Sequence, residues 1–98
     1  MFEHGQRIGT HDFSLIVARK REQHDLDGRV AFIAGKKLGN AVWRNRAKRR
    51  MRSICFALGG PFPGYDVVFI ARRTVNDSEF DSMLDNARRA LSKNGIIS

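Results

Sequence analysis

A dense run of cations dominates the chemistry that this sequence could perform. Residues 44–52 contain six Lys or Arg side chains and no Asp or Glu. The wider segment 28–65 holds nine of the eighteen cations and none of the ten acids. Arg outnumbers Lys thirteen to five, and a guanidinium binds phosphate through two parallel hydrogen bonds. Charge concentrated in this way is typical of a surface that binds a polyanion, above all a nucleic acid.

The residue types that carry enzymatic chemistry are present but scattered. His4, His11 and His24 have no ligand spacing and no cysteine partners, so the sequence does not predict a zinc site. Asp25 and Asp27 lie in an expected turn, where Asp is favoured for local hydrogen bonding. No nucleophile stands at a recognisable spacing from a base. We therefore expect no catalytic residues and no metal ligands in the protein.

Length and composition predict one small domain over residues 1–98. The 98 residues are 42% hydrophobic, which is enough to bury a modest core. No apolar stretch approaches the roughly 20 residues that span a membrane, and no secretory signal opens the chain. The single cysteine, Cys55, cannot form an internal disulfide. We therefore expect a cytoplasmic protein without a membrane partner.

Three strands and two helices are expected to position the cations. Residues 11–19 and 29–34 have strand patterns, and the turn at 25–28 suggests that they pair as an antiparallel hairpin. Residues 65–71 are apolar on both faces, as expected of a central strand. The prediction is an α+β fold, a small two-layer sandwich in the order β-β-α-β-α, with a short helical stub over residues 1–6.

The first helix carries the basic run and is expected to begin after Asn40, a favourable N-cap. An apolar stripe recurs at three- and four-residue steps and should face the core: Trp43, Ala47, Met51, Ile54 and Leu58. Polar and cationic residues fall on the opposite side: Asn45, Arg46, Lys48, Arg49 and Arg52. Arg44 and Arg50 lie on the borders, where their stems can follow the core and carry the charge outward.

This helix and the loop before it resemble the signature of the bacterial ribonuclease P protein subunit family. The family pattern is an aliphatic residue, then Ala, then Arg-Asn-Arg, then Lys-Arg and a further cation at helical spacing. The positions that fit this pattern are Leu38, Ala41, residues 44–46, residues 48–49 and Arg52. Segments 28–32 and 64–72 are similar to two strands of the family. The resemblance covers nearly the whole chain.

The resemblance implies a ribonucleoprotein enzyme in which RNA is the catalyst. The protein would bind ribonuclease P RNA and the 5′ leader of precursor tRNA, and would assist endonucleolytic removal of that leader. Mg²⁺ would be held mainly by the RNA subunit. The family fold adds a left-handed βαβ crossover around the basic helix, in a mixed sheet of about four strands. The chain would begin inside the family's first helix, so that helix would be truncated.

The resemblance also assigns two sets of binding residues. The set expected to bind the ribozyme comprises Lys36, Lys37, Arg44, Asn45, Arg46, Lys48, Arg49 and Arg52. The set expected to line a cleft for the single-stranded leader comprises Phe2, Phe13, Ile16 and Phe32. Aromatic stacking on unpaired bases tolerates any sequence, which suits a processor of many leaders. For Phe13, a place in the cleft and a place in the core are about equally expected. Trp43 is expected to anchor the core.

Other functions share parts of this pattern. A structural RNA-binding protein, such as a ribosomal protein, would carry the charge without needing a leader cleft. A DNA-binding module would lay the helix in the major groove, but the sequence shows no helix-turn-helix and no dimer seam, so no DNA partner is expected. A solvated helix face is disfavoured, because eight cations between residues 36 and 52 have no acid with which to pair.

Overall fold

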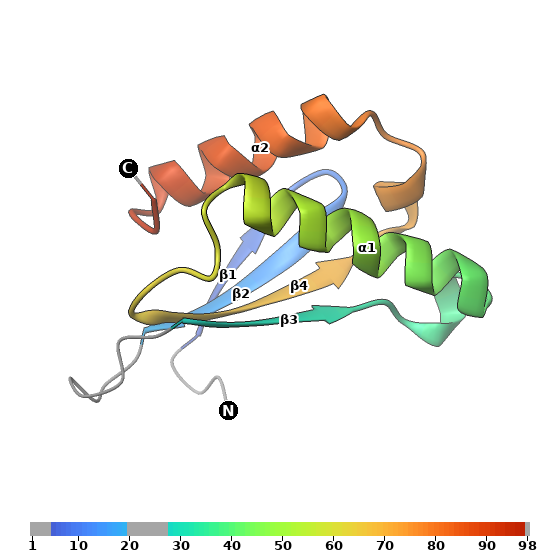
Figure 1. The fold of residues 1–98 in the computed structure, drawn as a ribbon, viewed down its shortest axis with the longest axis horizontal. Coiled ribbons are helices and arrows are strands. Elements are labelled where there is room, and N and C mark those ends of the chain that lie inside the picture. The colour runs from blue at the N-terminus through green and yellow to red at the C-terminus, as the bar shows by residue number, and fades with distance from the viewer. Residues whose placement is uncertain (1–4, 20–27, 98) are drawn as a thin grey trace.

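One four-stranded sheet, covered on one face by two helices, makes up the fold (Figure 1). The computed structural model describes residues 5–19 and 28–97. Its elements are β1 (Gln6–Gly9), β2 (Phe13–Arg19), β3 (Arg29–Ile33), the 3₁₀ turn η1 (Lys36–Leu38), α1 (Ala41–Ala57), β4 (Tyr65–Ala71), the 3₁₀ turn η2 (Arg73–Asn76) and α2 (Phe80–Lys93). The predicted two-layer α+β fold is confirmed.

Strand β4 lies inside the sheet and combines two kinds of pairing. The strand order is β1-β2-β4-β3, with β2 antiparallel to both β1 and β4, and β3 parallel to β4. The central position predicted for residues 65–71 is confirmed. The antiparallel hairpin predicted between residues 11–19 and 29–34 is wrong. Apolar alternation determines which face a strand buries but not which strand lies beside it, and both edges of β2 are taken by β1 and β4.

Strand β1 was not predicted from the sequence. The helical stub expected over residues 1–6 is wrong at Gln6, which begins β1, while residues 1–4 lie outside the described part of the chain. Ile8, 6% exposed, is the only large apolar side chain of this strand. A single apolar residue has no periodicity, so pairing with β2 alone identifies the segment as a strand.

Strands β3 and β4 and the helix α1 between them form a left-handed βαβ unit. The two strands are parallel neighbours, and α1 lies over the same face of the sheet as α2. In Figure 1 both strands point to the right beneath the helices, with β4 behind β3. Seen from the helices with the strands pointing up, β4 is therefore to the left of β3. This rare hand agrees with the one that the resemblance implied.

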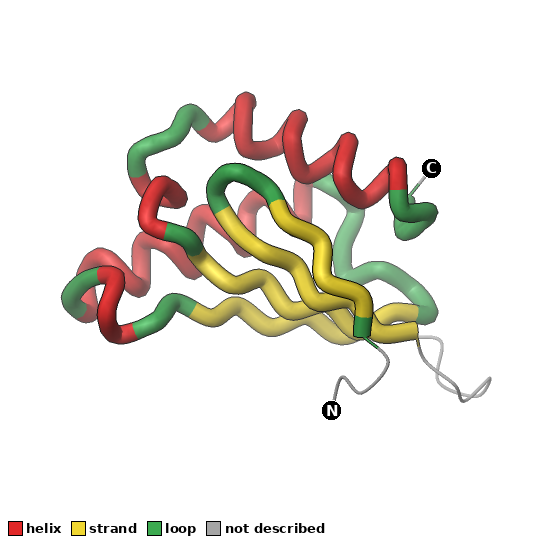
Figure 2. The backbone as a smooth tube through the Cα atoms, turned by 180° about the vertical axis from the view of Figure 1, so that it is seen from behind, coloured by secondary structure: helices red, strands yellow, loops and turns green. Residues whose placement is uncertain are grey.

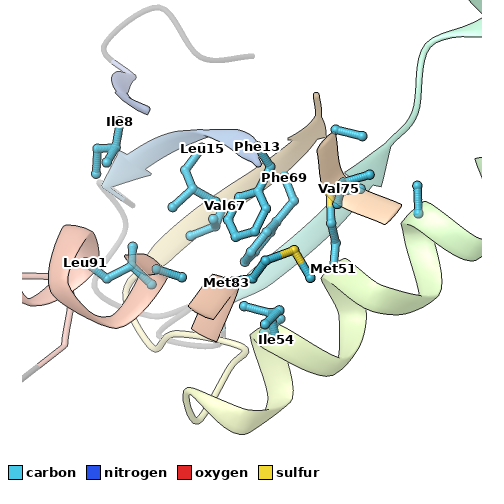
Figure 3. Close-up of a cluster of buried hydrophobic side chains, with 14 of the residues drawn as sticks. Ile8, Phe13, Leu15, Met51, Ile54, Val67, Phe69, Val75, Met83 and Leu91 are labelled. Carbon is cyan, nitrogen blue, oxygen red and sulfur yellow. The ribbon is translucent and has the colours of Figure 1, made fainter. Parts of the chain in front are cut away.

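The core lies between the two helices and the sheet (Figure 3). Phe13, Leu15 and Phe69 from the sheet have no exposed surface, and Met51 of α1 and Met83 of α2 close over them. The view from behind shows both helices on one side of the sheet (Figure 2). No described element covers the other face, which we call the open face. Among the described elements, the sheet therefore has one face packed in the core and one face over which no helix lies.

Candidate nucleic-acid interface

Helix α1 buries its apolar stripe and turns its polar side outward, as predicted. The Asn40 side chain accepts a hydrogen bond from the Trp43 amide at 2.9 Å, which confirms the N-cap. The buried residues are Ala47, Met51, Ile54 and Cys55. Trp43 is half-buried and packs against the core, which confirms it as an anchor. This burial fixes the rotation of α1 about its axis. The cations on the opposite side of the helix therefore point away from the core.

The lysines before α1 are held by a tight junction. Lys36 and Lys37 lie on η1, where both are exposed and where the Leu38 amide donates to the carbonyl of Gly35 at 3.1 Å. Gly39 then passes so close to Trp43 that a Cβ atom would lie 2.7 Å from the indole Cγ. This close approach permits only glycine without a shift of the indole, so it keeps η1, which carries the two lysines, against the start of α1.

The outward face of α1 is cationic, and no described acid neutralises it. Asn45, Arg46, Arg49 and Arg52 are exposed, whereas Arg44 and Lys48 are half-buried. Between described residues the ion pairs are Arg29–Asp66 at 3.0 Å and Arg88–Asp85 at 3.8 Å, and neither involves α1. A surface of unpaired cations binds phosphates favourably because binding releases the counterions that the polyanion had condensed.

Two border arginines of α1 are partly used by the fold. The Arg50 guanidinium donates to the carbonyl of Ser78 and so ties α1 to the segment before α2. The Nε atoms of Arg44 and Arg50 are both buried without a partner among the described residues. Nearby, the Asn76 side chain donates to the carbonyl of Trp43 at 3.0 Å. Arg50 is therefore structural, and the remaining cations of α1 are left for a ligand.

The structure divides the residues predicted for the leader cleft between two faces, so their grouping in one cleft is wrong. Phe13 is fully buried, with its ring centroid 5.4 Å from that of Phe69, and therefore belongs to the core. Phe32 is half-buried on the same helix-covered face, 5.3 Å from Phe69. Ile16 lies on the open face, and Phe2 lies outside the described residues. The period of two along β2 causes this division, because residues 13 and 16 point in opposite directions.

The open face carries an apolar surface that sequence reasoning missed. Opposite pairs of β2 and β4 bring Ile16 against Val68 and Ser14 against Ile70. On β3, Ala31 is opposite Val68, and Ile33, 48% exposed, is opposite Ile70. The available signal was that residues 65–71 are apolar at every second position on both faces. That pattern indicated a central strand, but it also predicts apolar side chains on a face without helices.

Arginines border this apolar surface on its β1 side. Arg7 of β1 is opposite Ile16 in the register and is exposed. The Arg72 guanidinium donates to the carbonyl of Thr10 at 2.6 Å and to Ser14 Oγ at 3.0 Å. These two bonds hold Arg72 at the edge of the open face while its side chain stays exposed. The open face therefore combines an apolar floor with fixed positive charge.

The described residues do not assemble a catalytic or metal-binding site. No three His, Cys, Asp or Glu side chains among them gather where they could hold a metal ion. The buried Asp12 carboxylate accepts hydrogen bonds from the hydroxyls of Thr74, at 2.8 Å, and Ser78. Burial raises the pKa of the Cys55 thiol to about 11, so this thiol stays protonated and unreactive at neutral pH.

No helix in the described part of the chain is long and apolar enough to cross a membrane.

Residues 1–95 match the ribonuclease P family. The ribonuclease P protein component of Ruegeria pomeroyi is 46% identical over 83 residues, which are 81% of this chain and 66% of that protein. The corresponding protein of Streptococcus agalactiae is 31% identical over 97 residues, which are 99% of this chain and 86% of that protein.

Solved structures agree at the level of the fold. The ribonuclease P protein of Staphylococcus aureus superposes with a TM-score of 0.78 at 22% identity, covering 99% of this chain and 87% of that one. The Thermotoga maritima protein gives a TM-score of 0.75 at 23% identity, covering 94% of this chain and 86% of that one. By sequence and by fold, this chain belongs to the ribonuclease P protein family.

Proposed function

We propose that this chain is the protein subunit of ribonuclease P and assists removal of the 5′ leader from precursor tRNA. Family membership supplies the reaction class, tRNA processing by an endoribonuclease holoenzyme. The observation that carries the binding role is the cationic face of α1, which has no ion-pair partner among the described residues. The partners are the catalytic RNA and precursor tRNA, which places the action in the cytoplasm.

The α1 face binds the catalytic RNA in this proposal. Its residues are Lys36, Lys37, Arg44, Asn45, Arg46, Lys48, Arg49 and Arg52. These side chains contact phosphates and sugars, which position the protein on the RNA without reading its sequence. Exposure supports this role for Arg46, Arg49, Arg52 and both lysines, whereas Arg44 can reach outward only with the end of its guanidinium.

The open face of the sheet receives the single-stranded leader. Ile16 and Ile70 are half-buried and offer an apolar floor on which bases of any identity can lie, whereas Val68 between them is 8% exposed and contributes little accessible surface. Arg7 and Arg72 stand beside that floor, where they can neutralise the leader backbone. Of the residues predicted to line the cleft, Ile16 is retained in this assignment. Phe13 and Phe32 are replaced by residues of β4.

Catalysis belongs to the RNA in this proposal. When bound to RNA phosphates, Mg²⁺ supplies an activated water for hydrolysis of one phosphodiester bond. The residues of the protein bind and orient the two RNAs. The Cys55 thiol does not offer an alternative nucleophile, because burial raises its pKa to about 11 and keeps it protonated at neutral pH.

Reconstitution tests the proposal. The chain is combined with a bacterial ribonuclease P RNA and a 5′-labelled precursor tRNA at a low Mg²⁺ concentration, where the RNA alone cleaves slowly. We expect release of the leader to require both components. RNA binding without stimulated cleavage would reassign the chain as a structural RNA-binding protein. Leader release by the protein without the RNA would place the chemistry on protein side chains and contradict the proposal.

A further inference from the structure

The outermost line of helix α1 contains two exposed apolar side chains separated by a cation. Val42, Arg49 and Phe56 follow one another at seven-residue steps, so they lie nearly in line along the helix. This line is opposite the stripe that Ala47 and Met51 bury. Each step is roughly 10 Å along the axis. Val42 is 77% exposed and Phe56 is 58% exposed.

The fold does not account for the Phe56 ring. Ile54 and Cys55, the two residues before it, fill the buried positions at this end of α1 with no exposed surface. Neither of the ring-ring contacts within the described residues involves Phe56; both involve Phe69. Most of the ring therefore remains in water, although it is one of the largest apolar groups in the chain. Aromatic side chains, Phe among them, are enriched in the parts of a protein surface that a partner covers.

The surroundings of Phe56 select the chemistry of that partner. Arg49 and Arg52 precede it by seven and four residues, and both are exposed on the same side of α1. Segment 28–65 contains no acid at all, so every charge near this ring along α1 is positive. A protein partner would need an acidic rim around an apolar pocket. A nucleic acid supplies both features at once, because each nucleotide joins an anionic phosphate to a base with a π face.

We propose that Phe56 stacks on an unpaired base of the RNA that α1 binds. The inference rests on the proposed function, since it assumes that the α1 face meets the catalytic RNA. In this arrangement Arg49 and Arg52 bind phosphates while the ring stacks on a base that is turned out of its helix, at a loop or bulge. The stack gives α1 a preference for one place on a folded RNA, which phosphate contacts alone do not provide.

The test compares variants of the full chain in binding a bacterial ribonuclease P RNA across a series of salt concentrations. Phe56→Ala removes the ring, Phe56→Leu keeps apolar area without a π face, and Phe56→Trp keeps the π face. Val42→Ala is the matched control, because it removes a more exposed apolar side chain that has no ring. Circular dichroism confirms that each variant is folded.

We expect Phe56→Ala to weaken binding by about 5- to 150-fold, the range measured for loss of one base–aromatic stack. Phe56→Leu should lose most of the same affinity, and Phe56→Trp should retain it. The slope of log Kd against log salt should stay at the wild-type value in all three, since no phosphate contact is removed. Chemical probing should show one unpaired base protected by wild-type protein and by Phe56→Trp, and exposed with Phe56→Ala.

Three results would overturn the inference. Equal RNA affinity of wild type and Phe56→Ala would contradict the stacking of Phe56 on a base, but it would leave the proposed function intact. Equal affinity of wild type and Phe56→Leu, or loss of self-association in Phe56→Ala by sedimentation, would assign the ring to an apolar or protein contact. Absence of salt-dependent RNA binding by the wild-type chain would instead contradict the proposed function itself.

Discussion

The Arg52 guanidinium on α1 lies over the ring of Phe32 on β3, with 5.4 Å between the guanidinium carbon and the ring centroid. Phe32 packs in turn on Phe69 in the centre of the sheet. A residue predicted to bind the ribozyme is therefore held by one predicted to line the leader cleft. Phe32 is unavailable to the open face because it is opposite the buried Phe69 in the register of β3 and β4.

The Arg52–Phe32 contact should be measurable as a coupling energy. A double-mutant cycle with Arg52→Ala and Phe32→Leu should give about 0.5–1 kcal/mol in urea unfolding, the range for an exposed cation–π pair. Leu preserves most of the apolar contact between β3 and the core, so the cycle isolates the ring face. Additive effects of the two substitutions would show that the contact contributes nothing to stability.

Arg49→Ala should weaken binding to ribonuclease P RNA and reduce the salt slope by about one phosphate contact. Arg49 is exposed on α1 and has no carboxylate partner among the described residues, so its charge is available to the RNA. Arg89→Ala, an exposed arginine on α2, is the matched control and should leave both affinity and slope unchanged. Equal losses in the two variants would indicate that only the total charge matters.

Ile16→Thr should weaken binding of leader-bearing precursor tRNA by the holoenzyme but not of mature tRNA. The substitution keeps a β-branched residue in β2 and places a hydroxyl on the apolar floor of the open face. Affinities of the reconstituted holoenzyme for the two tRNAs provide the measurement. If both affinities fell together, Ile16 would have no specific part in holding the leader.

Phe13→Ala should destabilise the protein by about 3–5 kcal/mol, because removing a fully buried ring leaves a cavity in the core. The free energy of unfolding in urea is the quantity to compare with wild type. Val42→Ala, on the exposed line of α1, should change it by less than about 0.5 kcal/mol. A small effect of Phe13→Ala together with a specific loss of leader affinity would return Phe13 to the cleft.

Cys55 should make stability depend on pH in alkaline solution. Its pKa is raised by burial from 9.0 to about 11, so the folded state disfavours the thiolate that the unfolded chain forms readily. The contribution of this thiol is complete below pH 9 and is lost as pH rises from 9 to 11. We expect wild type to lose about 2–3 kcal/mol more than Cys55→Ala across that window. If the free energies of unfolding of wild type and Cys55→Ala changed with pH in parallel, the raised pKa of Cys55 would be contradicted.

Local sequence patterns were sufficient for much of the fold and for the cationic face. The apolar stripe of α1 predicted both its buried side and its outward residues, because helix period and burial are local properties that one helix carries by itself. The apolar run of residues 65–71 predicted its central position in the same way. The absence of acids from residues 28–65 was enough to predict a polyanion partner, because charge balance depends on composition alone.

The tertiary structure decided which strands are neighbours and which residues make up the open face. The alternation of β3 fits an antiparallel partner or a parallel one equally well, and only the crossover through α1 places β3 beside β4. Strand β1 exists because β2 offers it a free edge, since its own residues carry almost no apolar signal.

The family resemblance suggested that Phe13, Phe32 and Ile16 share a cleft, whereas the pleat of the sheet separates the two rings from Ile16. The sequence by itself determined the cationic helix face and predicted a polyanion as its ligand. Which strands meet, and which side chains share a face, depended on contacts between residues far apart in the chain. Such contacts form only when the whole sheet and both helices are packed, so no local pattern could predict them.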